Sequence, residues 1–233
     1  MLRLMPIPEY KGRSADEIAA GKFVNDSAWQ IHASLSWCDY AERKQAPTAL
    51  HYAGLHLRTG VEQLWFEVLF AASGGSITST AYEEALNSTT KLHKLIDMDG
   101  PHYVKFAEFI QILASVDSRS HPPTVVWDIA RLKRIHGGCS ELLLHFQGIP
   151  EKGYRSDAWN ENRLRFLLES ASWMWSEMTS RGNLAVYAPE GLKKPEVFSL
   201  WERYRDGTNT AEDVRIGLRI IQPIVGGRPF PPS

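Results

Sequence analysis

Apolar residues recur at intervals of three or four along most of the chain, which is the spacing of a helix with one buried face. The longest such stripe consists of Leu50, Ala53, Leu57, Val61, Leu64 and Val68. The same spacing predicts further helices over about residues 27–43, 157–178 and 195–204. No two segments alternate apolar and polar residues as neighbouring strands of a sheet do. The sequence therefore predicts an all-α protein.

Residues that disfavour helices divide the predicted elements. Asp99-Gly100-Pro101 is expected to separate a helix over residues 82–96 from one over residues 103–116, because proline lacks an amide hydrogen and clashes with the preceding turn. Gly137-Gly138 is expected to interrupt or end a helix that begins at Thr124. These breaks set the ends of the helices expected in the middle of the chain.

Two pairs of residues have the spacing of a capping box, which marks the beginning of a helix. Ser14 and Glu17 predict a short helix near the N-terminus. Thr210 and Asp213 predict a last helix that runs to Pro223.

The predicted helix over residues 157–178 carries apolar residues on two faces. The second face consists of Trp159, Phe166 and Trp173, which are seven positions apart. A helix that is apolar over so much of its surface is expected to be buried between two neighbours. We expect one face to serve the core and the other to serve a partner.

The composition is that of a folded protein, since 43% of the 233 residues are hydrophobic and 11% are aromatic. The net charge of −1 provides no global positive field to attract nucleic acid or an anionic membrane. The two cysteines, Cys38 and Cys139, lie in no metal-binding pattern, so we expect a reducing compartment, no metal and no other cofactor. Without a signal peptide or a membrane-spanning apolar run, the chain is expected to be cytoplasmic.

One short motif carries chemistry. Arg131 and His136 stand five positions apart on a predicted helix, and Gly137 follows them. Their side chains lie about 140° apart around the helix axis and could border one cleft. A guanidinium binds phosphate oxygens and an imidazole transfers protons near neutral pH, so the pair suffices in kind for metal-free phosphodiester cleavage. An arginine and a histidine also match this spacing by chance, in which case both have structural roles.

Positive charge gathers around this motif. Between Arg131 and Arg165, seven basic residues outnumber four acidic residues, although the whole chain has a net charge of −1. Lys133 and Arg134 would belong to a rim that binds phosphate or RNA. A solvated helix face explains the same charges without a ligand.

A second segment places the motif in a family context. Residues 50–65 are mostly small and apolar, with Arg58 and, four residues later, Glu62. This segment resembles the first long helix of HEPN domains (higher eukaryote and prokaryote nucleotide-binding). Members of that family carry an Arg-x4-His motif further along the chain, on the last core helix, and residues 131–137 stand at the corresponding distance. The resemblance covers about residues 48–150.

This resemblance implies a metal-independent endoribonuclease of the HEPN type, with a role as a toxin or in phage defence. A ribose 2′-hydroxyl would attack the adjacent phosphate, with His136 as general acid or base and Arg131 stabilising the phosphate charge. Arg58 and Glu62 would support the site. Because such sites often form across a two-fold axis, we expect a homodimer, with RNA as substrate and a protein partner such as an antitoxin.

The residue after the motif arginine favours a different function. Family members that cleave RNA usually carry a polar residue there, and Leu132 follows Arg131 in this chain. Many members of the family serve as binding or dimerisation modules. The alternative is therefore a catalytically silent helical module that binds a nucleotide or a protein partner. An open cleft shared by Arg131 and His136 would distinguish the two functions.

The predicted organisation has three parts. Residues 1–26 are an N-terminal extension with the short helix, and residues 27–150 are a HEPN-like antiparallel helical bundle. Residues 151–233 supply additional helices that pack on the bundle or mediate association.

Overall fold

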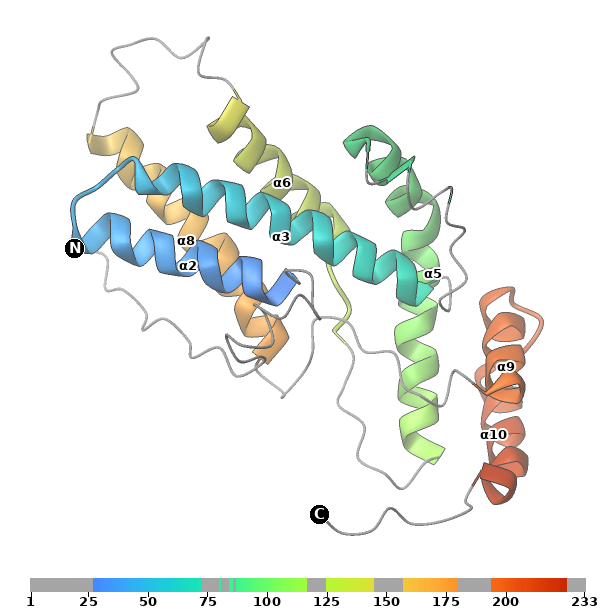
Figure 1. The fold of residues 1–233 in the computed structure, drawn as a ribbon. Coiled ribbons are helices and arrows are strands. Elements are labelled where there is room, and N and C mark those ends of the chain that lie inside the picture. The colour runs from blue at the N-terminus through green and yellow to red at the C-terminus, as the bar shows by residue number, and fades with distance from the viewer. Residues whose placement is uncertain are drawn as a thin grey trace. The chain divides into compact units, whose positions relative to one another are not determined.

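A computed structural model describes residues 27–72, 80, 84–85, 87–116, 125–144, 157–179 and 194–225. The named elements are α2 (Ser27–Arg43), α3 (Ala49–Ala72), α5 (Thr89–Val116), α6 (Ile129–Leu144), α8 (Asp157–Thr179), α9 (Pro195–Arg205) and α10 (Ala211–Val225) (Figure 1). All are helices, so the all-α prediction is confirmed over the described residues. The short helix predicted near Ser14 lies outside them.

The helices form two compact units. Unit 1 contains α2, α3 up to Leu64, α6 and α8, and unit 2 contains α3 from Trp65, α5, α9 and α10. The predicted parts 27–150 and 151–233 cut across this division, because α8 groups with α2, α3 and α6 while α5 groups with α9 and α10.

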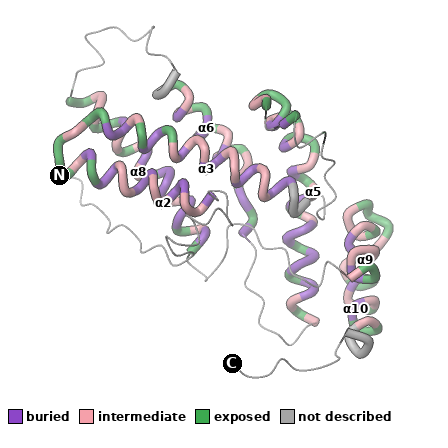
Figure 2. Tube along the Cα trace, in the orientation of Figure 1, coloured by how far each residue is buried: buried purple, intermediate pink, exposed green. Residues whose placement is uncertain are grey.

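Unit 1 is a helical bundle built on the predicted α3 stripe. All six residues of that stripe are buried, although Val68 falls in the part of α3 that belongs to unit 2. The pair α2 and α3 runs antiparallel, since Gln30 contacts His56 while Trp37, further along α2, contacts Tyr52. The same bundle buries, from α2, α6 and α8, the residues Ile31, Leu35, Cys38, Leu132, Ile135, Cys139, Leu167, Ala171 and Met174. Figure 2 shows buried positions recurring along each helix.

Glycine permits a close crossing of α2 and α3. A Cβ atom at Gly60 would lie 2.6 Å from Cδ1 of Ile31, which is closer than side chains approach one another. This glycine therefore lets the two backbones pack where a larger residue would hold them apart.

Unit 2 is organised around a cluster of aromatic rings. The Trp201 side chain of α9 is fully buried, and its ring centroid lies 5.2 Å from that of Phe106 and 5.6 Å from that of Phe109, both on α5. The predicted capping box begins α10: the Thr210 amide donates to Asp213, and the Asp213 amide donates back to the Thr210 hydroxyl. Helix α9 begins at Pro195, as the sequence predicts.

The predicted break at Asp99-Gly100-Pro101 is wrong. Helix α5 is continuous from Thr89 to Val116 and includes Pro101. One apolar stripe runs through the whole helix, and its buried residues include Leu92, Ile96, Tyr103, Phe106, Ile110 and Leu113. Burial of this stripe on both sides of the proline offsets the roughly 3 kcal/mol that a proline costs inside a helix.

The limits predicted for α6 are also wrong. The helix begins at Ile129 rather than Thr124, because the Asp128 side chain caps it by accepting a 2.8 Å hydrogen bond from the Arg131 amide. It continues through Gly137 and Gly138 to Leu144. The second glycine has a packing role, since a Cβ atom at Gly138 would lie 2.5 Å from Cζ of Phe166 on α8.

Candidate functional site

The capped start of α6 fixes the position of the motif arginine. Arg131 is half-buried, and its guanidinium lies over the ring of Trp173 on α8, with Cζ 3.9 Å from the ring centroid. Trp127 meets the same ring edge-on at a centroid distance of 5.8 Å. This cation–π contact holds the arginine against α8.

The motif histidine faces a different helix. His136 is only 4% exposed, and its Nε2 atom lies 2.8 Å from Oε1 of Glu62 on α3. Because an ionised carboxylate only accepts hydrogen bonds, Nε2 carries the hydrogen and donates it. The same Glu62 oxygen accepts a 3.2 Å hydrogen bond from Nε of Arg58, the partner that the i,i+4 spacing predicts. Arg58, Glu62 and His136 therefore form one connected polar cluster, which we call the Glu62 cluster.

The Glu62 cluster stabilises a negative charge that is partly removed from water. Burial alone would raise the pKa of the Glu62 carboxyl, but the hydrogen bond from His136 and the nearby Arg58 guanidinium outweigh it. The pKa of Glu62 consequently lies below its ordinary value. The carboxylate is ionised over the whole neutral range.

The described contacts of the two motif residues lie on different helices. Arg131 contacts α8, whereas His136 contacts α3. This divergence follows from five positions of helical spacing, which turn the second side chain about 140° from the first. Leu132 directly follows Arg131 in the sequence. Its side chain is fully buried, so it belongs to the core of unit 1. The sequence placed Arg131 and His136 at one cleft, and their described contacts lie on separate helices.

The two residues predicted to bind phosphate or RNA lie on α6. Arg134 is exposed and Lys133 is half-buried, both on α6.

Within the described ranges, no three histidine, cysteine or acidic side chains cluster in a way that could hold a metal ion. No helix among the described residues is both long enough and apolar enough to cross a membrane.

The aromatic face of α8 has intramolecular partners. Trp173 packs against Trp127 and Arg131, and Phe166 lies against Gly138 of α6. Trp159 stacks under the guanidinium of Arg163 on its own helix, at 3.8 Å. Trp173 and Phe166 therefore contact residues of unit 1 outside α8, so this aromatic face packs within the bundle at these two positions.

The two thiols are unreactive at neutral pH. Cys38 and Cys139 are fully buried and form no disulfide. Burial raises the pKa of each thiol to about 12, so both stay protonated at neutral pH. A protonated, buried thiol is neither a nucleophile nor a ready metal ligand.

The lowered pKa of Glu62 predicts an acid-sensitive contribution to stability. A carboxyl whose folded pKa lies below its unfolded value stabilises the fold fully above the unfolded pKa, and loses this contribution as the pH falls through the folded pKa. The ordinary pKa of the group is 4.5. The stability difference between the wild type and Glu62→Gln should therefore be constant near neutral pH and shrink below pH 4.5, as measured by urea unfolding at a series of pH values.

The matched control is Glu84→Gln, which alters an exposed carboxylate whose partner Lys91 is equally exposed. It should change stability by less than about 0.5 kcal/mol at every pH. A Glu62→Gln difference that stays the same down to acid unfolding would contradict the role assigned to the Glu62 cluster.

The chain was also compared with known proteins. No protein-family model, no curated protein and no solved structure matches it. The resemblance to HEPN domains thus rests on the residues described above.

Proposed function

We propose that this chain is a catalytically silent helical interaction module. One observation carries the proposal: the imidazole of His136 is 4% exposed and donates a hydrogen bond to Glu62. A general acid or base must come within hydrogen-bond distance of the proton that it transfers, and a buried, engaged imidazole is badly placed for an RNA substrate.

The environment of the motif arginine supports the same proposal. Its guanidinium stacks on Trp173, and the following residue, Leu132, is fully buried in the core. Both motif side chains thus make contacts that hold α6 to its neighbours α3 and α8. A structural role of this kind accounts for the arginine and the histidine without a substrate.

An exposed aromatic surface on unit 1 suits an interaction module. Tyr40 is 46% exposed, Tyr52 is 54% exposed and Leu55 is 51% exposed. The ring of Trp37 stacks on Tyr52 at a centroid distance of 4.9 Å and meets Tyr40 edge-on at 5.8 Å. Aromatic side chains are enriched at protein interfaces, where they dominate the binding energy. We call these four residues the α2–α3 aromatic surface.

The proposed partner for this surface is a second copy of the chain. A two-fold dimer brings a patch against itself, and it is the commonest closed arrangement of identical chains. None of the four side chains is charged, so two copies would meet without repulsion between like charges. The proposed assembly is therefore the homodimer that the sequence analysis also expects.

The dimer predicts a change in sedimentation on mutation. At tens of micromolar the wild type should sediment as a dimer. Leu55→Lys should yield a monomer of unchanged helical content, because a charge would enter the apolar surface that the two copies bury. Met98→Lys is the matched control, since Met98 is equally apolar and 60% exposed but belongs to unit 2. A monomeric wild type, or a Leu55→Lys variant that remains dimeric, would contradict this interface.

The absence of catalysis is tested directly with RNA. The purified full chain should leave single-stranded and structured RNA intact, in magnesium and in EDTA, with no product that ends in a 2′,3′-cyclic phosphate. The same preparation must be folded, as judged by its helical circular dichroism. Metal-independent cleavage that disappears in His136→Ala and with a 2′-deoxy substrate would overturn the silent-module proposal.

A HEPN-type endoribonuclease with a toxin or defence role is the second candidate, because of one contact. The carboxylate of Glu62 accepts the hydrogen of His136, and such a carboxylate fixes the tautomer and the orientation of a histidine. That arrangement would suit an acid–base residue once a partner chain or a rearrangement exposed it. In that case an antitoxin or an RNA would be the partner, and the assay above would detect cleavage.

A further inference from the structure

Unit 2 contains a pocket that the proposed function does not use. It has a volume of about 410 Å³, which is within the range of small-ligand sites. Three helices line it: α5 contributes Glu108, Gln111, Ile112 and Ser115, α9 contributes Tyr204, and α10 contributes Ala211 and Arg215. We call it the α5–α10 pocket.

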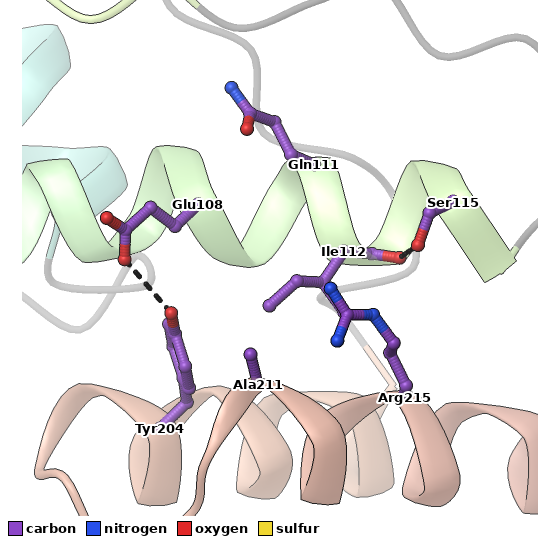
Figure 3. Close-up of a pocket in the computed structure, with 7 residues that line it drawn as sticks. All are labelled: Glu108, Gln111, Ile112, Ser115, Tyr204, Ala211 and Arg215. Carbon is purple, nitrogen blue, oxygen red and sulfur yellow. Dashed lines mark hydrogen bonds between the residues drawn. The ribbon is translucent and has the colours of Figure 1, made fainter.

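The two ends of the α5–α10 pocket carry opposite charges. Figure 3 shows Glu108 meeting the Tyr204 hydroxyl at one end, while Arg215 reaches toward Ile112 and Ser115 at the other. The side chains of Ile112 and Ala211 lie between them. The pocket thus combines an acceptor, a short apolar wall and a cationic donor.

At the acidic end, Glu108 accepts a hydrogen bond from Tyr204. The Tyr204 hydroxyl donates a 3.0 Å hydrogen bond to Oε2 of Glu108. Burial, and then this hydrogen bond, raise the pKa of Tyr204, so the hydroxyl keeps its proton and remains the donor. The second carboxylate oxygen of Glu108 can accept a hydrogen bond from a cationic group such as an ammonium.

The basic end retains donor capacity. Nη1 of Arg215 donates to Glu212 at 3.1 Å, one turn earlier on α10. A guanidinium has five N–H groups, so one bond to Glu212 leaves others that can bind a carboxylate. The charges at the two ends would therefore suit a ligand that is both cationic and anionic.

The walls of the pocket are fixed by packing. Tyr204 and Trp201 on α9 both lie against Phe109 of α5, and Nζ of Lys105 donates a 2.7 Å hydrogen bond to the carbonyl oxygen of Arg205. A Cβ atom at Gly217 would lie 2.8 Å from Leu200, so α9 and α10 pack closely. Such support holds the three lining helices in place before a ligand arrives.

The spacing of the lining residues sets the length of the ligand. The lining residues of α5 extend from Glu108 to Ser115, which is about 10 Å along the helix axis, and Arg215 reaches toward the Ser115 end of this stretch. An extended chain spans at most about 3.6 Å per residue, so three residues cover about the same distance. We propose that the α5–α10 pocket binds short peptides of about three residues with free termini, the amino group at Glu108 and the carboxylate at Arg215.

Trialanine is the probe that tests this proposal, measured by calorimetry and ligand-detected NMR with the full chain. It should bind saturably with a dissociation constant in the millimolar range, about as expected for two charge-assisted contacts in an open pocket. N-acetyl trialanine and trialanine amide should each bind about tenfold more weakly, because each loses one charged contact. Binding that is unaffected by blocking either end would overturn the proposal, as would no saturation up to about 50 mM.

Two variants assign the termini to their ends of the pocket. Glu108→Gln should weaken trialanine about tenfold and cause no further loss with the N-acetyl peptide. Arg215→Gln should do the same with the C-terminal amide. The matched controls are Glu196→Gln on α9 and Arg219→Gln on α10, which remove exposed charges outside the pocket lining and should leave binding unchanged. Equal effects of the pocket variants and the control variants would show a nonspecific charge effect and contradict the site.

Discussion

Replacement of His136 by alanine should lower the free energy of unfolding by about 3 kcal/mol, which is the largest effect that we expect from a motif residue. The substitution removes a buried side chain and leaves a void between α6 and α3. It also removes the hydrogen bond to the ionised carboxylate of Glu62, and bonds to charged groups contribute more than neutral ones. Urea unfolding at neutral pH, followed by circular dichroism, measures the change.

The control for this prediction is another histidine in an ion pair. His102 on α5 lies 3.6 Å from Asp99, and both side chains are well exposed. His102→Ala should therefore change the free energy of unfolding by less than about 1 kcal/mol. If His136→Ala proves as stable as the wild type, the imidazole is not held by the fold, and the ribonuclease candidate gains support over the silent module.

Alanine at Gly137 and at Gly138 should have opposite effects on stability. At Gly137, a Cβ atom meets nothing within 4 Å, so alanine should stabilise α6 by about 1 kcal/mol through its better helix propensity. At Gly138, the Cβ atom would lie 2.5 Å from the ring of Phe166. Forcing that ring away should cost more than the propensity gains, so we expect a net loss of about 1–2 kcal/mol.

These neighbouring substitutions control for each other, because both replace glycine by alanine within one helix. The difference between their free energies of unfolding should be about 2–3 kcal/mol. A second variant relieves the clash: Phe166→Leu combined with Gly138→Ala should recover part of the loss. Equal stability of the two single variants would mean that Phe166 does not pack against Gly138.

The sequence predicts a helix well where one apolar stripe runs along the whole helix. The α3 stripe identifies a helix whose six stripe residues are all buried, and the spacing of Thr210 and Asp213 identifies the cap of α10. Residues that disfavour helices predict the ends of helices less reliably, since α5 continues through Pro101 and α6 continues through Gly138. A helix continues through such a residue when its apolar face is buried against other helices. The residues next to it in the sequence do not show whether that burial occurs.

The residues of the candidate site could be predicted from the sequence, but the contacts between its helices could not. The Arg58–Glu62 pair follows from helical spacing, and the motif at Arg131 and His136 is visible in the sequence. The contact between Glu62 and His136 joins residues 74 positions apart, and only the packing of α3 against α6 creates it. Helical spacing placed the two motif residues within reach of one cleft, but it could not show that each would be engaged by a different neighbouring helix.

The interleaving of the two units along the chain has a consequence for synthesis. Unit 1 is built from residues up to 64 and from 127 to 180, and the segment between them belongs to unit 2. At the usual rate of about 5–20 residues per second, the second half of unit 1 begins to emerge from the ribosome roughly 3 to 12 s after the first half. Until α6 and α8 have emerged, the apolar stripes of α2 and α3 lack them, and α5 likewise emerges before α9 and α10. A nascent chain of this kind exposes apolar helices for seconds, so its yield in cells should depend on chaperones that bind unfinished chains.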